Sequence, residues 1–180
     1  MGILDYFSAD WAGGSNKNKE IGKMRTHFET KKLVPCYSEK GRCERCRRVL
    51  SLYSMELRRG MWNAFGLREF VLEPVRLKYG KPIRVTRCFV CSRRCKRRGL
   101  DEQYSTGERA DITATHGARR IADGCDEYMR AENVKIGRLI EETVEFDQLV
   151  YENCDEQGRP EWLTVSYRRD GENRHEVTRR

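Results

Sequence analysis

The sequence predicts an α+β protein, and three observations support that class. Residues 83–86 alternate between apolar and polar side chains, as strands with one buried face do. Residues 121–143 place apolar side chains at helical spacing. Two Cys-x-x-Cys pairs, at residues 43–46 and 88–91, indicate a small cysteine-rich module ahead of the helical stretch.

Composition divides the chain into three segments. Residues 1–33 are expected to form a flexible arm, because residues 12–19 have the Gly, Ser, Asn and Lys content of a linker. Residues 34–100 hold six of the eight cysteines and are strongly basic. Residues 101–180 are expected to form an acidic α+β region.

The elements of residues 34–100 are expected in the following order. Residues 41–46 form a tight turn, and residues 49–57 have a period that fits either a strand or a helix. Residues 70–72 and 75–79 are expected to be extended, with Pro74 between them. A turn at 80–82 leads into the strand at 83–86, and a helix over 91–98 ends at Gly99.

The C-terminal region begins with an expected helix that Ser105 or Thr106 caps, with Glu108 in its first turn. Helical spacing continues over residues 121–129, and a further helix is expected over 133–143. Strands are expected at 146–151 and 162–168, joined by a turn at 155–160. The polar tail after Asp170 is expected to fray.

The cysteine pairs point to zinc. Zinc prefers four soft ligands in a tetrahedron, and a two-residue spacer lets one turn supply two thiolates. We therefore expect one structural site held by Cys43, Cys46, Cys88 and Cys91. A knuckle, a hairpin and then a helix carrying the second pair is the order of a treble-clef-like module, followed here by a small helix-plus-hairpin region.

The compartment supports metal over disulfides. The N-terminus shows no signal peptide and no run is long and apolar enough to span a membrane, so we expect an intracellular protein of the cytoplasm or nucleus. A redox role for one pair is the competing interpretation, but the strand–helix context of a thioredoxin motif is missing.

The remaining cysteines and histidines leave a second metal site open. Cys95 could replace Cys91 as a ligand or join Cys36, and His116 could join Cys95 and Cys125. Cys125 is expected in a helix core, Cys154 in a polar turn, and His116 in solvent.

Charge is distributed unevenly. Residues 40–98 hold 18 basic and 4 acidic residues, whereas residues 123–161 hold 12 acidic and 4 basic ones. Neutralising phosphates through such a surface gives sequence-independent affinity for nucleic acid. The expected contacts are the arginines and the lysine beside the cysteine pairs, namely Arg45, Arg47, Arg48, Arg93, Arg94, Lys96, Arg97 and Arg98.

The same arginines have two other interpretations. They could form a solvated charged face, such as a nuclear localisation signal, or could dock the acidic C-terminal half. Trp62, Phe65 and Phe89 are interleaved with the arginines and could stack on unpaired bases, which would favour RNA, although Trp62 and Phe65 are more often core residues.

Residues 41–49, Gly-Arg-Cys-Glu-Arg-Cys-Arg-Arg-Val, resemble a stretch of the cysteine-rich nucleic-acid-binding proteins of carlaviruses and related plant RNA viruses. The resemblance implies zinc ligation by Cys43 and Cys46 and nucleic-acid contacts by the neighbouring arginines. It also implies a viral regulatory protein or suppressor of RNA silencing. Here the second pair follows after 41 residues, and the densest arginine cluster follows Cys91 rather than preceding the finger.

These observations favour a zinc-dependent nucleic-acid-binding protein, with RNA preferred over DNA. A DNA-binding transcription regulator and a protein-interaction adaptor, with a partner on the acidic half, are the alternatives. An enzyme is not expected, because the sequence lacks a Gly-rich phosphate loop, a His-Glu-x-x-His motif and a nucleophile elbow.

Overall fold

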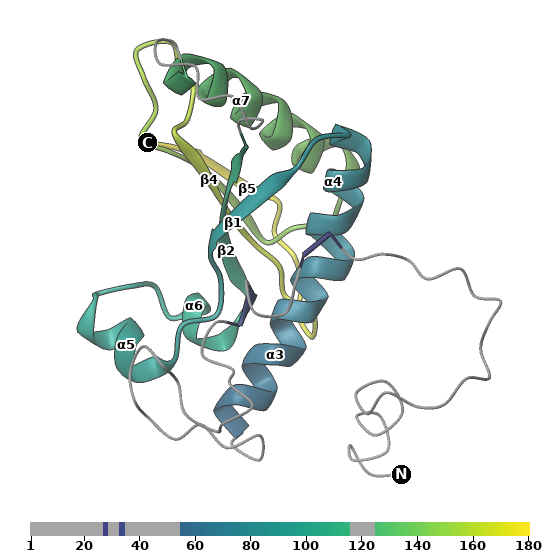
Figure 1. Ribbon diagram of the computed structural model, residues 1–180. Coiled ribbons are helices and arrows are strands. Elements are labelled where there is room, and N and C mark those ends of the chain that lie inside the picture. Colours follow the sequence, from purple (N-terminus) through teal and green to yellow (C-terminus); the bar gives the residue numbers. More distant parts are fainter. Residues whose placement is uncertain (1–26, 29–32, 35–54, 116–124) are drawn as a thin grey trace, which may run out of the picture.

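A five-stranded sheet organises the described part of the chain (Figure 1). The computed structural model describes residues 27–28, 33–34, 55–115 and 125–180. In these ranges the chain is a mixture of helices and one sheet, which confirms the α+β class. The predicted ligands Cys43 and Cys46 lie outside the described residues.

The strands are arranged in the order β1-β2-β4-β3-β5. Every neighbouring pair is antiparallel except β3 and β5, which run parallel. The strand bounds are β1 (Ile83–Arg87), β2 (Arg109–Ala114), β3 (Gln148–Glu152), β4 (Trp162–Ser166) and β5 (Glu176–Arg179). The strands near 83–86, 146–151 and 162–168 are therefore confirmed.

The two faces of the sheet have different chemistry, because side chains alternate along each strand. One face carries fully buried apolar residues such as Ile112, Leu149 and Leu163. Helix α7 (Cys125–Thr143) packs against this face through contacts with β2, β3 and β4. The opposite face carries polar and charged side chains, including Asp111 and Glu152.

Residues 70–79 are helical, so the extended conformation predicted for them is wrong. Helix α3 (Met55–Leu67), the π-helical turn η1 (Arg68–Leu72) and helix α4 (Glu73–Tyr79) follow one another without a break. Their buried residues Leu67, Val71 and Val75 recur every four positions, which is helical spacing. Pro74 stands in the first turn of α4, directly after the π-helical turn, and its missing N–H leaves one backbone hydrogen bond out of this continuous run.

This arrangement differs from the hairpin expected between the cysteine pairs. Within residues 55–87 the one strand is β1, and it pairs with β2 rather than with a neighbour in its own segment. A boundary at residue 100 therefore falls between two strands that are hydrogen-bonded to each other. The described parts of residues 34–100 and 101–180 share one sheet.

Helix α5 (Ser92–Arg97) follows the second cysteine pair, as expected, and Gly99 after it has a left-handed φ of 59°. The capped helix predicted from Ser105 is wrong. A short helix, α6 (Gln103–Thr106), ends there instead, and β2 begins two residues after Gly107. Pairing with β1 and β4 on both sides holds residues 109–114 extended.

The described residues of the predicted arm and of the predicted tail pack more than the sequence suggests. The tail predicted to fray instead forms β5, which adds to β3. Phe28 and Leu33, within the predicted arm, are buried in the core. Phe28 lies beside Glu73, whose carboxylate accepts the backbone N–H of His27 at 2.6 Å. Of the described helices, none has the length and apolar character to cross a membrane.

Candidate nucleic-acid interface

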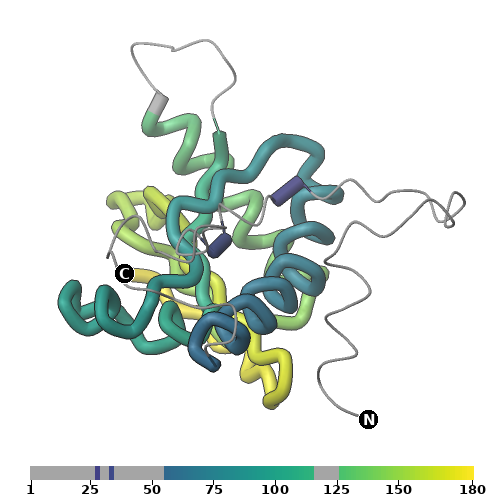
Figure 2. Tube along the Cα trace, turned by 60° about the horizontal axis from the view of Figure 1, so that its bottom comes forward, coloured from purple at the N-terminus to yellow at the C-terminus, as the bar shows by residue number. Residues whose placement is uncertain are grey.

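Helix α5 presents a compact group of cationic side chains. Arg93, Lys96, Arg97 and Arg98 are exposed, and Arg94 is half-buried. The helix lies at one end of the molecule beside α6, away from α4 and α7 (Figures 1 and 2). Its first backbone N–H, at Ser92, donates to the carboxylate of Glu56 at 2.7 Å, which ties α5 to α3.

The basic residues of α5 form no ion pair with any residue that the structure describes. Several arginines of the sheet and its loops are paired instead. Arg109 pairs with Asp101, Arg174 with Asp147, and Arg180 with Glu152. The acidic C-terminal half is therefore neutralised largely by cations of its own segment, and in the described ranges it does not dock α5.

Cys88 and Cys91 lie at the base of α5 and are fully buried. Cys91 is the residue that precedes the first turn of the helix. Burial raises the pKa of the Cys88 thiol to about 12. Both thiols pack in the same hydrophobic core as Phe89 and Leu33.

The described ranges contain two of the four predicted zinc ligands, Cys88 and Cys91. Among the described residues, no three His, Cys, Asp or Glu side chains are grouped so that they could hold a metal ion. Cys36, Cys43, Cys46 and His116 lie outside the described residues, as do Arg45, Arg47 and Arg48. Cys125 begins α7.

Cys95 is engaged in a different way. Its thiol donates to the carbonyls of Leu100 at 3.3 Å and Asp101 at 3.1 Å. A thiol that donates hydrogen bonds is protonated, whereas a zinc ligand is a thiolate. This geometry favours Cys91 over Cys95 as the partner of Cys88.

The described aromatic residues of the basic segment are buried or half-buried rather than exposed. Phe89 is fully buried. Trp62 is half-buried and covered by the guanidinium of Arg169 at 3.7 Å from its ring centre. Phe65 is half-buried against the core, with Arg68 at 4.9 Å. The stacking role suggested for these rings is therefore not supported by their positions.

The open face of the sheet contains a polar cleft of about 690 Å³ that sequence reasoning missed. Asp111 is almost fully buried in it and accepts a hydrogen bond from Thr164 at 2.9 Å and another from Tyr104. Arg87 approaches the same carboxylate at 3.3 Å. Burying charged groups costs free energy. This cluster of buried, paired charges therefore differs from an ordinary sheet face whose charges stay in water.

Two further arginines complete the cleft. Arg109 donates to Asp101 at 2.7 Å and to Gln148 at 2.6 Å. Arg180 makes two parallel hydrogen bonds to Glu152, each 2.8 Å long. The alternation of polar residues in β2, β3 and β4 is visible in the sequence, but strand order decides which of them meet.

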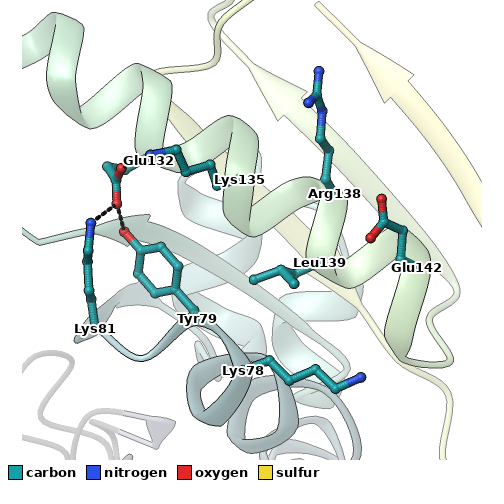
Figure 3. Close-up of a pocket in the computed structure, with 8 residues that line it drawn as sticks. All are labelled: Lys78, Tyr79, Lys81, Glu132, Lys135, Arg138, Leu139 and Glu142. Carbon is teal, nitrogen blue, oxygen red and sulfur yellow. Dashed lines mark hydrogen bonds and ion pairs between the residues drawn. The ribbon is translucent and has the colours of Figure 1, made fainter.

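A separate groove of about 360 Å³ lies between α4 and α7, and its lining is mainly basic (Figure 3). Glu132 stands in its wall, almost fully buried, and accepts hydrogen bonds from Lys81 and Tyr79 at 2.6 Å each. Lys135 approaches the other oxygen at 2.5 Å. Burial alone would raise the pKa of Glu132, but the hydrogen bonds from Lys135, Lys81 and Tyr79 lower it to about 2.

Removing this charge is expected to destabilise the protein in a pH-dependent way. Glu132→Gln should lower the free energy of unfolding at neutral pH by about 1–3 kcal/mol. Because the pKa is depressed in the fold from 4.5 to about 2, the carboxylate stabilises above the unfolded pKa and loses this effect as pH falls toward the folded one. The difference from wild type should therefore shrink on acidification.

Urea unfolding at a series of pH values measures this, with Glu142→Gln as the control. Glu142 lines the same groove on the same helix but is exposed. A deficit for Glu132→Gln that stays constant as pH falls would contradict the assignment.

Comparison with known proteins adds no further constraint. No protein-family model, no curated protein and no solved structure matches the chain.

Proposed function

We propose that the protein is a zinc-dependent nucleic-acid-binding protein that uses the basic surface of α5 to hold the phosphates of RNA. The supporting observation is the density of unpaired cations at α5. Arg93, Lys96, Arg97 and Arg98 are exposed within six residues and form no ion pair among the described residues, whereas Arg109 and Arg180 of the sheet are paired. Free cations next to a polyanion release condensed counterions, which supplies affinity.

Zinc has a positional role in this proposal. Cys88 and Cys91 immediately precede α5, so that an ion held by them together with Cys43 and Cys46 would fix the start of the helix. It would also bring Arg45, Arg47 and Arg48 toward the same surface, as in a treble-clef-like module. The ion would be structural, because four thiolates leave no open position. No catalytic role is proposed.

The size of α5 favours RNA over sequence-specific duplex DNA. A helix of six residues is about 9 Å long, which is short for a recognition helix that reads several base edges in the major groove. Phosphate contacts require only exposed cations. A viral regulatory or silencing-suppressor role, in the cytoplasm or nucleus of a host cell, is part of the same proposal.

A binding panel tests the proposal. Single- and double-stranded RNA and DNA of equal length should be titrated at two salt concentrations with the full chain. Preference for RNA with a steep salt dependence is expected. Sequence-selective binding of duplex DNA would favour the transcription regulator, and absence of binding to all four would favour an adaptor that uses the acidic half to hold a protein partner.

Changing Arg97 and Arg98 together to Ala is expected to weaken binding to all sequences alike. The dependence of log affinity on log salt should become shallower by about one to two units, since each phosphate contact contributes about 0.7–0.9. Zinc content and thermal stability should stay unchanged, because both side chains are exposed.

The matched control removes two other cations, Lys78 and Arg138, from the groove between α4 and α7. Helices α4 and α7, which carry these residues, lie away from α5 (Figure 1). An equal reduction of the salt slope in both double variants would show that net charge, not α5, determines binding.

A further inference from the structure

The cleft on the open face of the sheet adjoins the basic surface of α5. Gly99, Leu100 and Asp101 form one of its walls, and they follow Arg98 directly in the chain. Leu100 lies two residues beyond Arg98, so their Cα atoms are at most about 7.6 Å apart. A strand whose phosphates contact the end of α5 would therefore lie close to a wall of this cleft.

The charges inside the cleft are balanced. The three guanidinium groups of Arg87, Arg109 and Arg180 each face a carboxylate at 2.7–3.3 Å. A cleft that has already neutralised its cations attracts a free phosphate weakly. It offers polar groups in fixed positions instead, from Gln148, which is hydrogen-bonded to Arg109 and Glu176, and from the ion pairs themselves.

The cleft has room for a planar polar group and has walls that can stack on it. A volume of about 690 Å³ lies within the range of small-ligand sites. Trp162, which is half-buried and lies across from Glu152 in the neighbouring strand, supplies an aromatic surface. The Arg87 guanidinium, with a side chain 39% exposed, supplies a second planar surface for stacking.

We propose that this cleft takes one unpaired nucleobase of the RNA strand whose phosphates lie on α5. The inference rests on the proposed function and adds to it a division of roles. The cations of α5 hold the backbone without regard to sequence. The neutral cleft stacks and hydrogen-bonds a base, which restricts binding to strands with an unpaired nucleotide.

Blocking the cleft tests this without removing any of its contacts. Thr178 is exposed on the edge strand β5 and lines the cleft. Thr178→Trp fills the space, and Thr178→Val is the control of equal size. Leu100→Trp obstructs the cleft from its opposite wall, so that a folding defect in one variant does not decide the result. Circular dichroism establishes that each variant is folded.

The probes are a single-stranded RNA of roughly 12 nucleotides, within the usual site sizes, and an abasic oligomer of the same length and charge. Wild type and Thr178→Val should bind the RNA about tenfold more tightly than the abasic oligomer. Thr178→Trp and Leu100→Trp should bind both with equal affinity and an unchanged salt slope.

Three other results would overturn the inference, and they distinguish its failure from the failure of the proposed function. Wild type that binds both oligomers equally, or blocked variants that keep the preference for bases, would leave α5 as the interface and exclude the cleft as a base site. Wild type that binds neither oligomer would refute the proposed function, and the cleft assignment would fall with it.

Discussion

Cys88→Ser is expected to abolish zinc binding and to unfold the basic module. In small structural sites metal binding and folding are one process, with an apparent free energy of about 10–16 kcal/mol. The unfolding should extend to the sheet, because β1 begins only five residues before Cys88 and pairs with β2. Elemental analysis of protein purified without chelator should give about one zinc per chain for wild type and none for the variant.

Two companion variants separate metal loss from packing loss. Cys154→Ser should retain zinc, because Cys154 is half-buried at the edge of the core and its thiol donates a hydrogen bond to the carbonyl of Tyr151, away from the cysteine pair. Cys95→Ser tests the alternative ligand. Full zinc content in Cys88→Ser, or zinc loss in Cys95→Ser with retention in Cys91→Ser, would contradict the assigned ligand set.

Gly107→Ala is expected to cost more than 3 kcal/mol of stability. Gly107 ends α6 with φ of 77°, a conformation that costs an L-residue about 1–2 kcal/mol. A Cβ at this position would also lie 2.2 Å from the carbonyl oxygen of Gly60, which is backbone of α3 and cannot rotate away. The substitution must therefore separate α3 from the α6–β2 corner that supports the cleft.

Gly158→Ala is the matched control, because it has a similar φ of 73° but nothing within 4 Å of the added Cβ. It should lose only the conformational part, about 1–2 kcal/mol. Thermal unfolding of the two variants beside wild type measures the difference. Equal destabilisation of the two variants would show that the close approach of Gly107 to Gly60 adds nothing to the cost of a Cβ at residue 107.

Local sequence patterns predicted the elements whose conformation depends mainly on their own residues. The alternation in 83–86 gave β1, helical spacing gave α7, and the turn at 155–160 joins β3 to β4 as expected. Helix α5 ends near Gly99 because glycine adopts the left-handed conformation without strain. The exposure of its arginines also follows from their local charge density.

Tertiary contacts decided the elements that local patterns misassigned. Residues 70–79 contain β-branched and aromatic side chains that suit a strand, but burying Val71 and Val75 on one side made them helical. The polar tail is ordered because β3 offers it a free edge and because Asp147 and Glu152 pair with Arg174 and Arg180. A local sequence pattern contains no information about a partner that is distant in the sequence.

The basic surface of α5 and the cleft also differ in how far apart in the sequence their residues lie. The cations of α5 are consecutive in the chain, so the sequence by itself determined that they form one surface. The cleft joins residues as far apart as Arg87 and Arg180, which meet only after five strands have paired in a non-sequential order. Side chains that alternate across a sheet become a site only when strand order and register are set, and the tertiary structure alone decided both.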